Sequence, residues 1–239
     1  IQANQTLEEM VGESFDNLIN KPIFNLFHKE DQLEIRGRFK AFFNKPEKKE
    51  INARMVRNTE TIHVALKGRR SYAGQAEKKI EPNLLITFTD ITQIKKNELE
   101  LRLAAKIFDT SIEGIIVTNT KGKIVRVNKA FSIVTGYSES EILGESPSIL
   151  QSGQHHKNFY NEMWQSLQDI GSWQGEIVNM RKNKETYVEW LSISSIRNAN
   201  GEVSHYVGIF SDITEKKLNT QQMQKLAYYD VLTNLPNRT

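Results

Sequence analysis

The sequence predicts an α+β fold in two copies, each a five-stranded antiparallel sheet with short helices on one face, joined by a helical linker and followed by an output helix. An internal repeat is the first observation: Asp90–Gln93 (DITQ) matches Asp212–Glu215 (DITE) at an offset of 122, each shortly after an apolar segment. The second is an asparagine followed eight residues later by a glycine, repeated at an offset of 124. The third is the alternation of short apolar segments with turn residues. The repeated pair is Asn4 and Gly12 in the first copy, and Asn128 and Gly136 in the second.

Composition excludes several classes of function. The 239 residues suit two ordinary domains, and 26% charged with 38% hydrophobic residues is typical of a globular protein. The net charge of +3 is small and spread along the chain, so we expect no nucleic-acid partner. Cysteine is absent, which removes disulfides and thiolate chemistry. No apolar run approaches the roughly 18 residues of a membrane span, so we expect a cytoplasmic fragment without membrane contact, whether or not the full-length protein is anchored.

The first copy is expected over residues 1–92. Ile1–Asn4 corresponds to Val125–Asn128 of the second copy, so we expect its first strand to be missing, whether truncated or disordered. The hydrophobic pattern predicts the remaining elements from amphipathic and apolar stretches. They are a helix at Asp31–Phe43, strands at Glu50–Val56, Thr61–Leu66 and Leu84–Phe88, and a polar loop at Gly68–Pro82.

The second copy is expected over residues 110–212 and is complete. Its turns contain glycine and asparagine, which tolerate a positive φ angle. The predicted strands are Gly114–Asn119, Ile124–Asn128, Gln174–Arg181, Thr186–Ile196 and Glu202–Ser211. The predicted helices are Lys129–Thr135, Glu139–Leu143 and Lys157–Gln168.

A helical linker at residues 93–109 has apolar side chains on two opposed sides. A helix of this kind must be covered twice, which favours one stripe packed on a sheet and the other paired with its twin in a parallel homodimer. A single helix wedged between two domains is the alternative. One stripe contains Ile94, Leu101, Ala105 and Phe108; the other contains Leu99, Leu103 and Ile107.

The repeated DIT motif predicts a junction between strand and helix. Asp212 is expected to be the N-cap of a signalling helix at residues 213–229, with Glu215 completing a capping box. Asp90 is expected to do the same for the linker. The predicted signalling junction therefore comprises Asp90, Thr92, Asp212 and Thr214.

The second copy resembles a PAS domain over Ile107–Glu215, and the first resembles a more divergent one over Ile1–Gln93. The motifs that carry the resemblance are Asn128, Gly136-Tyr137, Trp173–Glu176, Arg181–Asn183 and the terminal DIT.

Residues 230–239 contain Asp230–Arg238 (DVLTNLPNR), which resembles the opening of GGDEF domains, the diguanylate cyclases. That resemblance implies a regulatory fragment without catalytic residues, controlling cyclic di-GMP synthesis through a dimeric helix. Pro236 is similar to the variant in proteins that also contain a phosphodiesterase domain. Two alternatives stay open, the PAS input of a histidine kinase and a flavin-binding redox sensor.

Residues for a small-molecule pocket in the second copy follow from the PAS resemblance. Compared with flavin-binding LOV domains, this chain has Pro147 at the position of the cysteine that forms the adduct with flavin. The resemblance therefore implies that photoadduct chemistry is excluded. Asn179 matches one flavin-contacting asparagine, while Glu189 and Phe210 replace the other polar contacts. Non-covalent FAD remains a candidate cofactor. The pocket candidates are Trp164, Trp173, Asn179, Glu189 and Phe210, with the two tryptophans either flanking a planar ligand or filling the core.

Metal chemistry is not indicated. His155 and His156 lie where haem-binding PAS domains have their axial histidine, but adjacent histidines point about 100° apart on a helix. A haem is therefore not expected, and without a nearby third ligand neither is zinc. No nucleophile and base motif occurs, so no catalytic residue is expected in this fragment.

Overall fold

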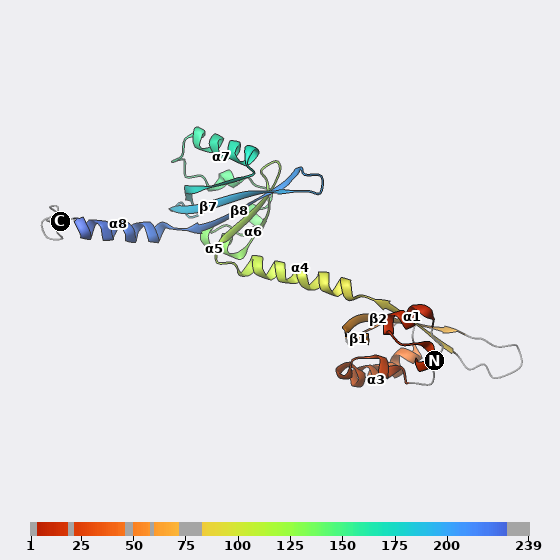
Figure 1. The fold of residues 1–239 in the computed structure, drawn as a ribbon. Coiled ribbons are helices and arrows are strands. Elements are labelled where there is room, and N and C mark those ends of the chain that lie inside the picture. Colours follow the sequence, from red (N-terminus) through yellow and green to blue (C-terminus); the bar gives the residue numbers. More distant parts are fainter. Residues whose placement is uncertain (1–3, 19–21, 46–49, 58–59, 72–82, 229–239) are drawn as a thin grey trace, which may run out of the picture. The chain divides into compact units, whose positions relative to one another are not determined.

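The computed structural model describes residues 4–18, 22–45, 50–57, 60–71 and 83–228. The chain divides into two compact units, residues 1–102 and 103–239, each with its own sheet (Figure 1). The units are described one at a time.

The described part of unit 1 contains a three-stranded antiparallel sheet with strand order β1-β2-β3. Asn4 caps the first helix by accepting a hydrogen bond from the Leu7 backbone N–H at 3.1 Å. Met55, Val64 and Leu66 are fully buried between the sheet and the helices. The elements are α1 (Gln5–Val11), α2 (Phe15–Leu18), η1 (Ile23–Leu26), α3 (Lys29–Asn44), β1 (Glu50–Arg57), β2 (Glu60–Ser71) and β3 (Asn83–Asp90).

One prediction for the first copy is wrong in part. Gly68–Ser71 belongs to β2, not to a polar loop, because these residues pair with the start of β3, with Gly68 opposite Ile86. Backbone pairing thus overrides the polar composition of the segment. Residues 72–82 and the strand expected at residues 1–3 lie outside the described residues.

Unit 2 is a five-stranded antiparallel sheet with strand order β5-β4-β8-β7-β6 and short helices over one face (Figure 1). The predicted elements are confirmed to within two residues at each end. Phe131, Phe210 and Ile124 are nearly fully buried in the core beneath the helices. The elements are β4 (Gly114–Asn119), β5 (Ile124–Val127), α5 (Lys129–Thr135), α6 (Glu139–Ile142), η3 (Pro147–Leu150), α7 (Lys157–Asp169), β6 (Ser172–Met180), β7 (Thr186–Arg197) and β8 (Val203–Asp212).

Two helices follow the two DIT motifs, α4 (Thr92–Thr110) and α8 (Thr214–Tyr228), and neither contains a buried residue among those described. Within unit 2, the end of α4 is anchored by Asn128, which is 2% exposed. Its side-chain amide donates hydrogen bonds to the Phe108 and Glu113 carbonyl oxygens, at 3.1 and 2.9 Å. Its Oδ1 accepts from the backbone N–H groups of Ile115 and Phe131, at 2.8 and 2.9 Å. One buried amide therefore joins α4, β4 and α5.

Candidate functional site: a pocket and a strand-to-helix junction

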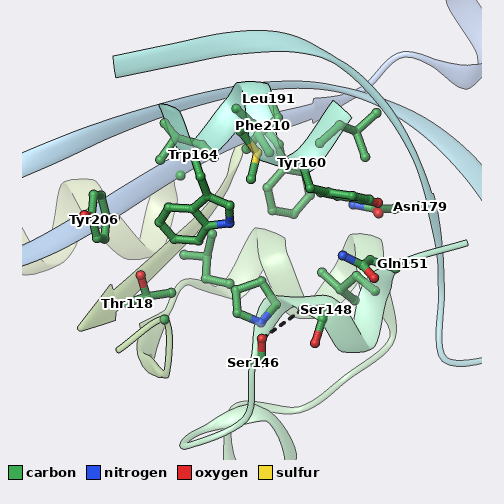
Figure 2. A pocket seen from close by; sticks show the side chains of 18 of the residues that line it. Thr118, Ser146, Ser148, Gln151, Tyr160, Trp164, Asn179, Leu191, Tyr206 and Phe210 are labelled. Atoms are coloured by element: carbon green, nitrogen blue, oxygen red, sulfur yellow. Dashed lines mark hydrogen bonds between the residues drawn. The ribbon is translucent and has the colours of Figure 1, made fainter. Parts of the chain in front are cut away.

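Unit 2 contains a pocket of about 300 Å³ between the sheet and the segment from η3 to α7. Figure 2 shows Asn179 and Gln151 toward one end of the pocket, Tyr206 toward the other, and the Trp164 ring between them. The walls are mainly apolar, and polar groups gather near Asn179. A cavity of this size, apolar with a few polar groups, is typical of small-molecule sites. The apolar and aromatic lining includes Ile116, Phe131, Leu150, Met163, Leu167, Ile177, Leu191, Ile193 and Phe210.

Of the five residues predicted for the pocket, Trp164, Asn179, Glu189 and Phe210 line it, but Trp173 does not. The Trp173 ring lies edge-on to Phe159 at 5.7 Å between ring centroids, and it covers Gly175, where an added Cβ would lie 2.8 Å from the ring. Trp173 therefore fills the space between β6 and α7 and cannot flank a ligand in this pocket. Trp164 is 40% exposed and meets Tyr206 edge-on at 5.5 Å, so it walls the cavity from α7.

The polar end of the pocket contains a buried carboxyl group, Glu189, which is 2% exposed. Its Oε1 accepts a hydrogen bond from Asn179 Nδ2 at 3.0 Å. Its Oε2 has no hydrogen-bond partner among the described residues, and neither has the hydroxyl of Tyr187. Burial raises the pKa of Glu189 to about 7, against the lowering effect of nearby Tyr187 and Asn179.

The segment before α7 contains Pro147 and the two histidines considered for cofactor chemistry. Pro147 lines the pocket at the position that the LOV resemblance gives to the reactive cysteine. His155 Nε2 accepts a hydrogen bond from the Val178 backbone N–H at 2.8 Å, and its ring stacks on Phe159. His156 precedes α7 and makes no side-chain cap. His155 therefore joins the segment before α7 to β6 through the Val178 backbone.

The junction at the end of β8 is built by Asp212 and Thr214. Asp212 ends the strand opposite Glu189, and its Oδ1 accepts a hydrogen bond from the Thr214 backbone N–H at 2.9 Å. The Thr214 hydroxyl accepts from the Val188 backbone N–H at 2.9 Å. The helix begins at Thr214, one residue later than the predicted start at residue 213, because sheet pairing holds Asp212 in β8. Asp212 thus ties the strand end to the first turn of α8 from within the strand.

Arg181 connects this junction to the pocket wall. Its guanidinium pairs with the Asp212 carboxylate, donates to the Val134 carbonyl oxygen at the end of α5, and stacks over the Tyr187 ring at 4.3 Å. Burial alone would raise the pKa of Asp212, but hydrogen bonds from Thr214 and Arg181 hold it below its usual value. Sequence reasoning used Arg181 only as part of the PAS motif and did not predict its role at the junction. That role depends on contacts with residues up to 47 positions away, which no local pattern indicates.

The first copy has the same junction. Asp90 Oδ1 accepts from the Thr92 backbone N–H at 2.8 Å, and the Thr92 hydroxyl accepts from the His63 backbone N–H at 2.9 Å. Ile91 then donates to the His63 carbonyl oxygen, as Ile213 does to that of Val188. The DIT repeat therefore encodes one hydrogen-bonded connection, present at the start of both α4 and α8.

Unit 2 is therefore an antiparallel sheet that encloses a small pocket beneath short helices and continues through its last strand into a helix. A family model described as PAS domain matches residues 1–93 and 112–215. The chain belongs to the PAS domain family and contains two copies of the domain.

The relatives are signalling proteins by name. The chain is 31% identical to the nitrogen fixation regulatory protein of Klebsiella oxytoca over 136 residues, which is 54% of this chain and 28% of that protein. It is 28% identical to the blue-light-activated histidine kinase of Brucella anthropi over 130 residues, 49% of this chain and 26% of the relative. The match spans under a third of each relative. A solved PAS domain from Colwellia psychrerythraea is 27% identical over 48% of this chain and 98% of its own, with a TM-score of 0.47.

These findings describe a PAS sensory or regulatory module of a signalling protein. Among the described helices, none has the length and apolar character needed to cross a membrane.

Proposed function

We propose that this chain is the sensory module of a GGDEF protein and that it controls cyclic di-GMP synthesis through α8. The observation that carries the proposal is the string at Asp230–Arg238, which resembles the opening of a GGDEF domain and follows α8 directly. The string itself lies outside the described residues. The PAS pocket is the input site, the Asp212 junction is the connection, and α8 is the output element.

The structure supports the connection because the pocket and the junction share strand β7. Glu189 lines the pocket, while its neighbour Val188 donates its backbone N–H to the Thr214 hydroxyl and accepts the Ile213 backbone N–H at its carbonyl oxygen. A ligand that moves β7 would therefore move the first turn of α8. Such a shift needs only the small energy differences, a few kcal/mol, that separate two conformations of a switch.

We further propose that the module is a homodimer joined along α4. Leu101, Ile107 and Ile94 are each more than 60% exposed in the single chain. Ile94, Leu101 and Phe108 are spaced by seven residues, the period of a coiled-coil seam. No residue of α4 is buried within either unit, so both stripes are available for pairing with a second copy. Two cyclase domains brought together in this way match what the GGDEF resemblance implies.

The direct test is to incubate the full-length protein with GTP and Mg²⁺ and to identify the nucleotide product. The proposal expects cyclic di-GMP. If the protein instead transfers phosphate from ATP to a histidine of its own, it is a histidine kinase, the alternative favoured by relatives such as the Brucella anthropi protein. In that case the GGDEF proposal fails while the sensory role of the PAS domains stands.

A flavin such as FAD is a second candidate for the pocket, favoured by relatives named as blue-light receptors. The residues present fit a flat ring, because Trp164 and apolar side chains form the walls and Asn179 with Glu189 forms a polar edge. When bound, a flavin would supply absorption of blue light or a redox response. The protein purified from its host should then be yellow, with absorbance near 450 nm that is lost when Trp164 and Asn179 are replaced by alanine. A colourless protein that takes up no added FAD would contradict this assignment.

A further inference from the structure

One end of the PAS pocket presents a hydrogen-bond acceptor without a donor. Glu189 lines the cavity, is 2% exposed, and uses only one carboxylate oxygen, which accepts from Asn179. The other oxygen, Oε2, is buried without a hydrogen-bond partner in the part of the chain that the structure describes. Among the described lining residues, Glu189 is the one acidic side chain.

A buried acceptor of this kind calls for a physical explanation. Leaving a buried polar group unpaired costs about 1–3 kcal/mol, and more when the group is charged. Native proteins therefore rarely keep such atoms unless water, an ion, a ligand or a proton completes them. Glu189 can relieve the cost by binding a proton or by receiving a donor that enters the pocket.

No hydrogen bond of ordinary geometry reaches Oε2 from the groups around Glu189. The Tyr187 hydroxyl on β7 is near enough to lower the pKa of Glu189, but it too has no hydrogen-bond partner among the described residues. Arg181 is directed to Asp212 and to the Val134 carbonyl oxygen. Asp212 on β8 disfavours the charge of Glu189, as burial does, and Arg181 favours it. Two further titratable groups face this region: Tyr160 on α7, whose pKa is raised by burial and by Glu189, and His155, whose Nε2 is occupied by Val178.

The other lining residues indicate the shape of a ligand that would fit beside Glu189. Trp164, Phe131 and Phe210 offer apolar and aromatic surface. Gln151 and Ser148 lie on the same side of the pocket as Asn179 (Figure 2), whose amide donates to Glu189. Such walls favour a flat or compact apolar body with one polar edge.

We propose that this pocket selects small ligands that carry a neutral or cationic N–H donor group, which binds Glu189, and that it rejects ligands with an anionic group at that position. The inference deepens the proposed function, since it rests on the PAS pocket being the input site. It assigns Glu189 as the specificity-determining residue. Ionised Glu189 accepts the donor, so binding competes with the proton that the carboxyl group otherwise holds.

A size-matched series tests this: benzamidine, benzamide and benzoate, which share one ring and keep cationic, neutral and anionic charge between pH 6 and 8. Binding to the 239-residue protein is measured by NMR titration of the tryptophan indole N–H signals. Trp164 lines the pocket, and the signal of Trp190, which is 45% exposed and does not line it, is the internal control.

At pH 8 we expect benzamidine to bind at least tenfold more tightly than benzoate and to shift Trp164 but not Trp190. The affinity for benzamidine should fall about tenfold at pH 6, because a carboxyl group with a pKa of about 7 is then mostly protonated. In Glu189→Gln, which keeps the side-chain size, both the tenfold preference and the pH dependence should disappear. Equal binding of benzoate, an unchanged Glu189→Gln variant, or no binding of any probe in the pocket would overturn the proposal.

The variant Tyr187→Phe distinguishes ligand binding by Glu189 from the alternative that the Tyr187 hydroxyl is the hydrogen-bond donor to Glu189. The proposal expects this variant to keep both the preference for benzamidine and its pH dependence. If Tyr187→Phe abolishes the pH dependence as fully as Glu189→Gln does, the carboxyl group serves the tyrosine and the inference fails. Neither result bears on nucleotide synthesis by the full-length protein, so failure here is distinct from failure of the proposed function.

Discussion

Glu189 links the stability of the second PAS domain to pH. Its pKa is about 7 in the folded protein against a usual value of 4.5, with burial as the main cause. Below pH 4.5 both states are protonated, and as pH rises toward 7 the unfolded state releases its proton first. The stabilising contribution therefore declines across this range and is lost above pH 7.

Glu189→Gln should remove that decline. At pH 8 the variant should be more stable than the wild type by on the order of 3 kcal/mol, and at pH 4.5 nearly equal. Urea unfolding of both proteins at several pH values measures the difference in their free energies of unfolding. Carboxylates with a lowered pKa, such as Asp212, contribute equally to both proteins, so their opposite pH trend cancels in this difference. A difference that is constant with pH would show that Glu189 stays ionised.

Asp212→Ala removes the hydrogen bond to the Thr214 backbone N–H and leaves Arg181 without its carboxylate. The expected cost is about 1–2 kcal/mol, which is too small to unfold the domain. Thermal unfolding with circular dichroism measures it, and Asp169→Ala, at the exposed end of α7, is a matched control that should change little. A loss of folded protein at 25 °C would contradict the assigned role of Asp212.

The face of the sheet on which a side chain lies follows from alternation along the strand. Which part of that face lines the pocket does not. The resemblance to LOV domains predicted Glu189 and Asn179 as pocket residues, and alternation along β7 and β6 agrees, since both lie on the inner face. Trp173 has the same parity as Asn179 but lies six residues earlier, where α7 covers the strand with Phe159. The packing of a distant helix decides that difference. Whether the second Glu189 oxygen finds a partner likewise depends on the three-dimensional placement of neighbouring side chains such as Tyr187.

At the scale of elements, turns and apolar periodicity fixed the short helices and strands of the second copy because each has a local signal. The start of α8 was wrong by one residue because Asp212 is held in the strand by pairing with Glu189, 23 residues away. Gly68–Ser71 was wrong for the same reason. Cross-strand pairing extends a strand beyond what its own composition indicates.

The apolar stripes of α4 make a further prediction. Leu101→Lys places a charge in the proposed dimer seam and should shift sedimentation from dimer to monomer at micromolar concentration. Glu100→Lys introduces the same side chain one residue away, outside both stripes, and should leave the dimer intact. A wild-type protein that sediments as a monomer, or two variants that dissociate equally, would contradict pairing along α4.

At the scale of the whole molecule, the chain repeats one device twice: a PAS sheet whose last strand passes into a helix through an aspartate and a threonine. The repeat was visible in the sequence because the junction depends on neighbouring residues. The pocket was only partly visible because its walls come from seven segments of the chain, from β4 to β8. The second junction precedes α8, so it lies nearer to the proposed output than the first.

The central claim is that the Asp212 junction passes the state of the PAS domain to a cyclase. The most direct measurement compares the rate of cyclic di-GMP formation from GTP by the full-length protein with its Asp212→Ala and Asp90→Ala variants, each divided by the folded fraction from thermal melts. We predict that Asp212→Ala changes the rate per folded molecule severalfold and that Asp90→Ala changes it less, because another domain intervenes. No cyclic di-GMP from the wild type, or rates that follow the folded fraction alone in both variants, would contradict the account.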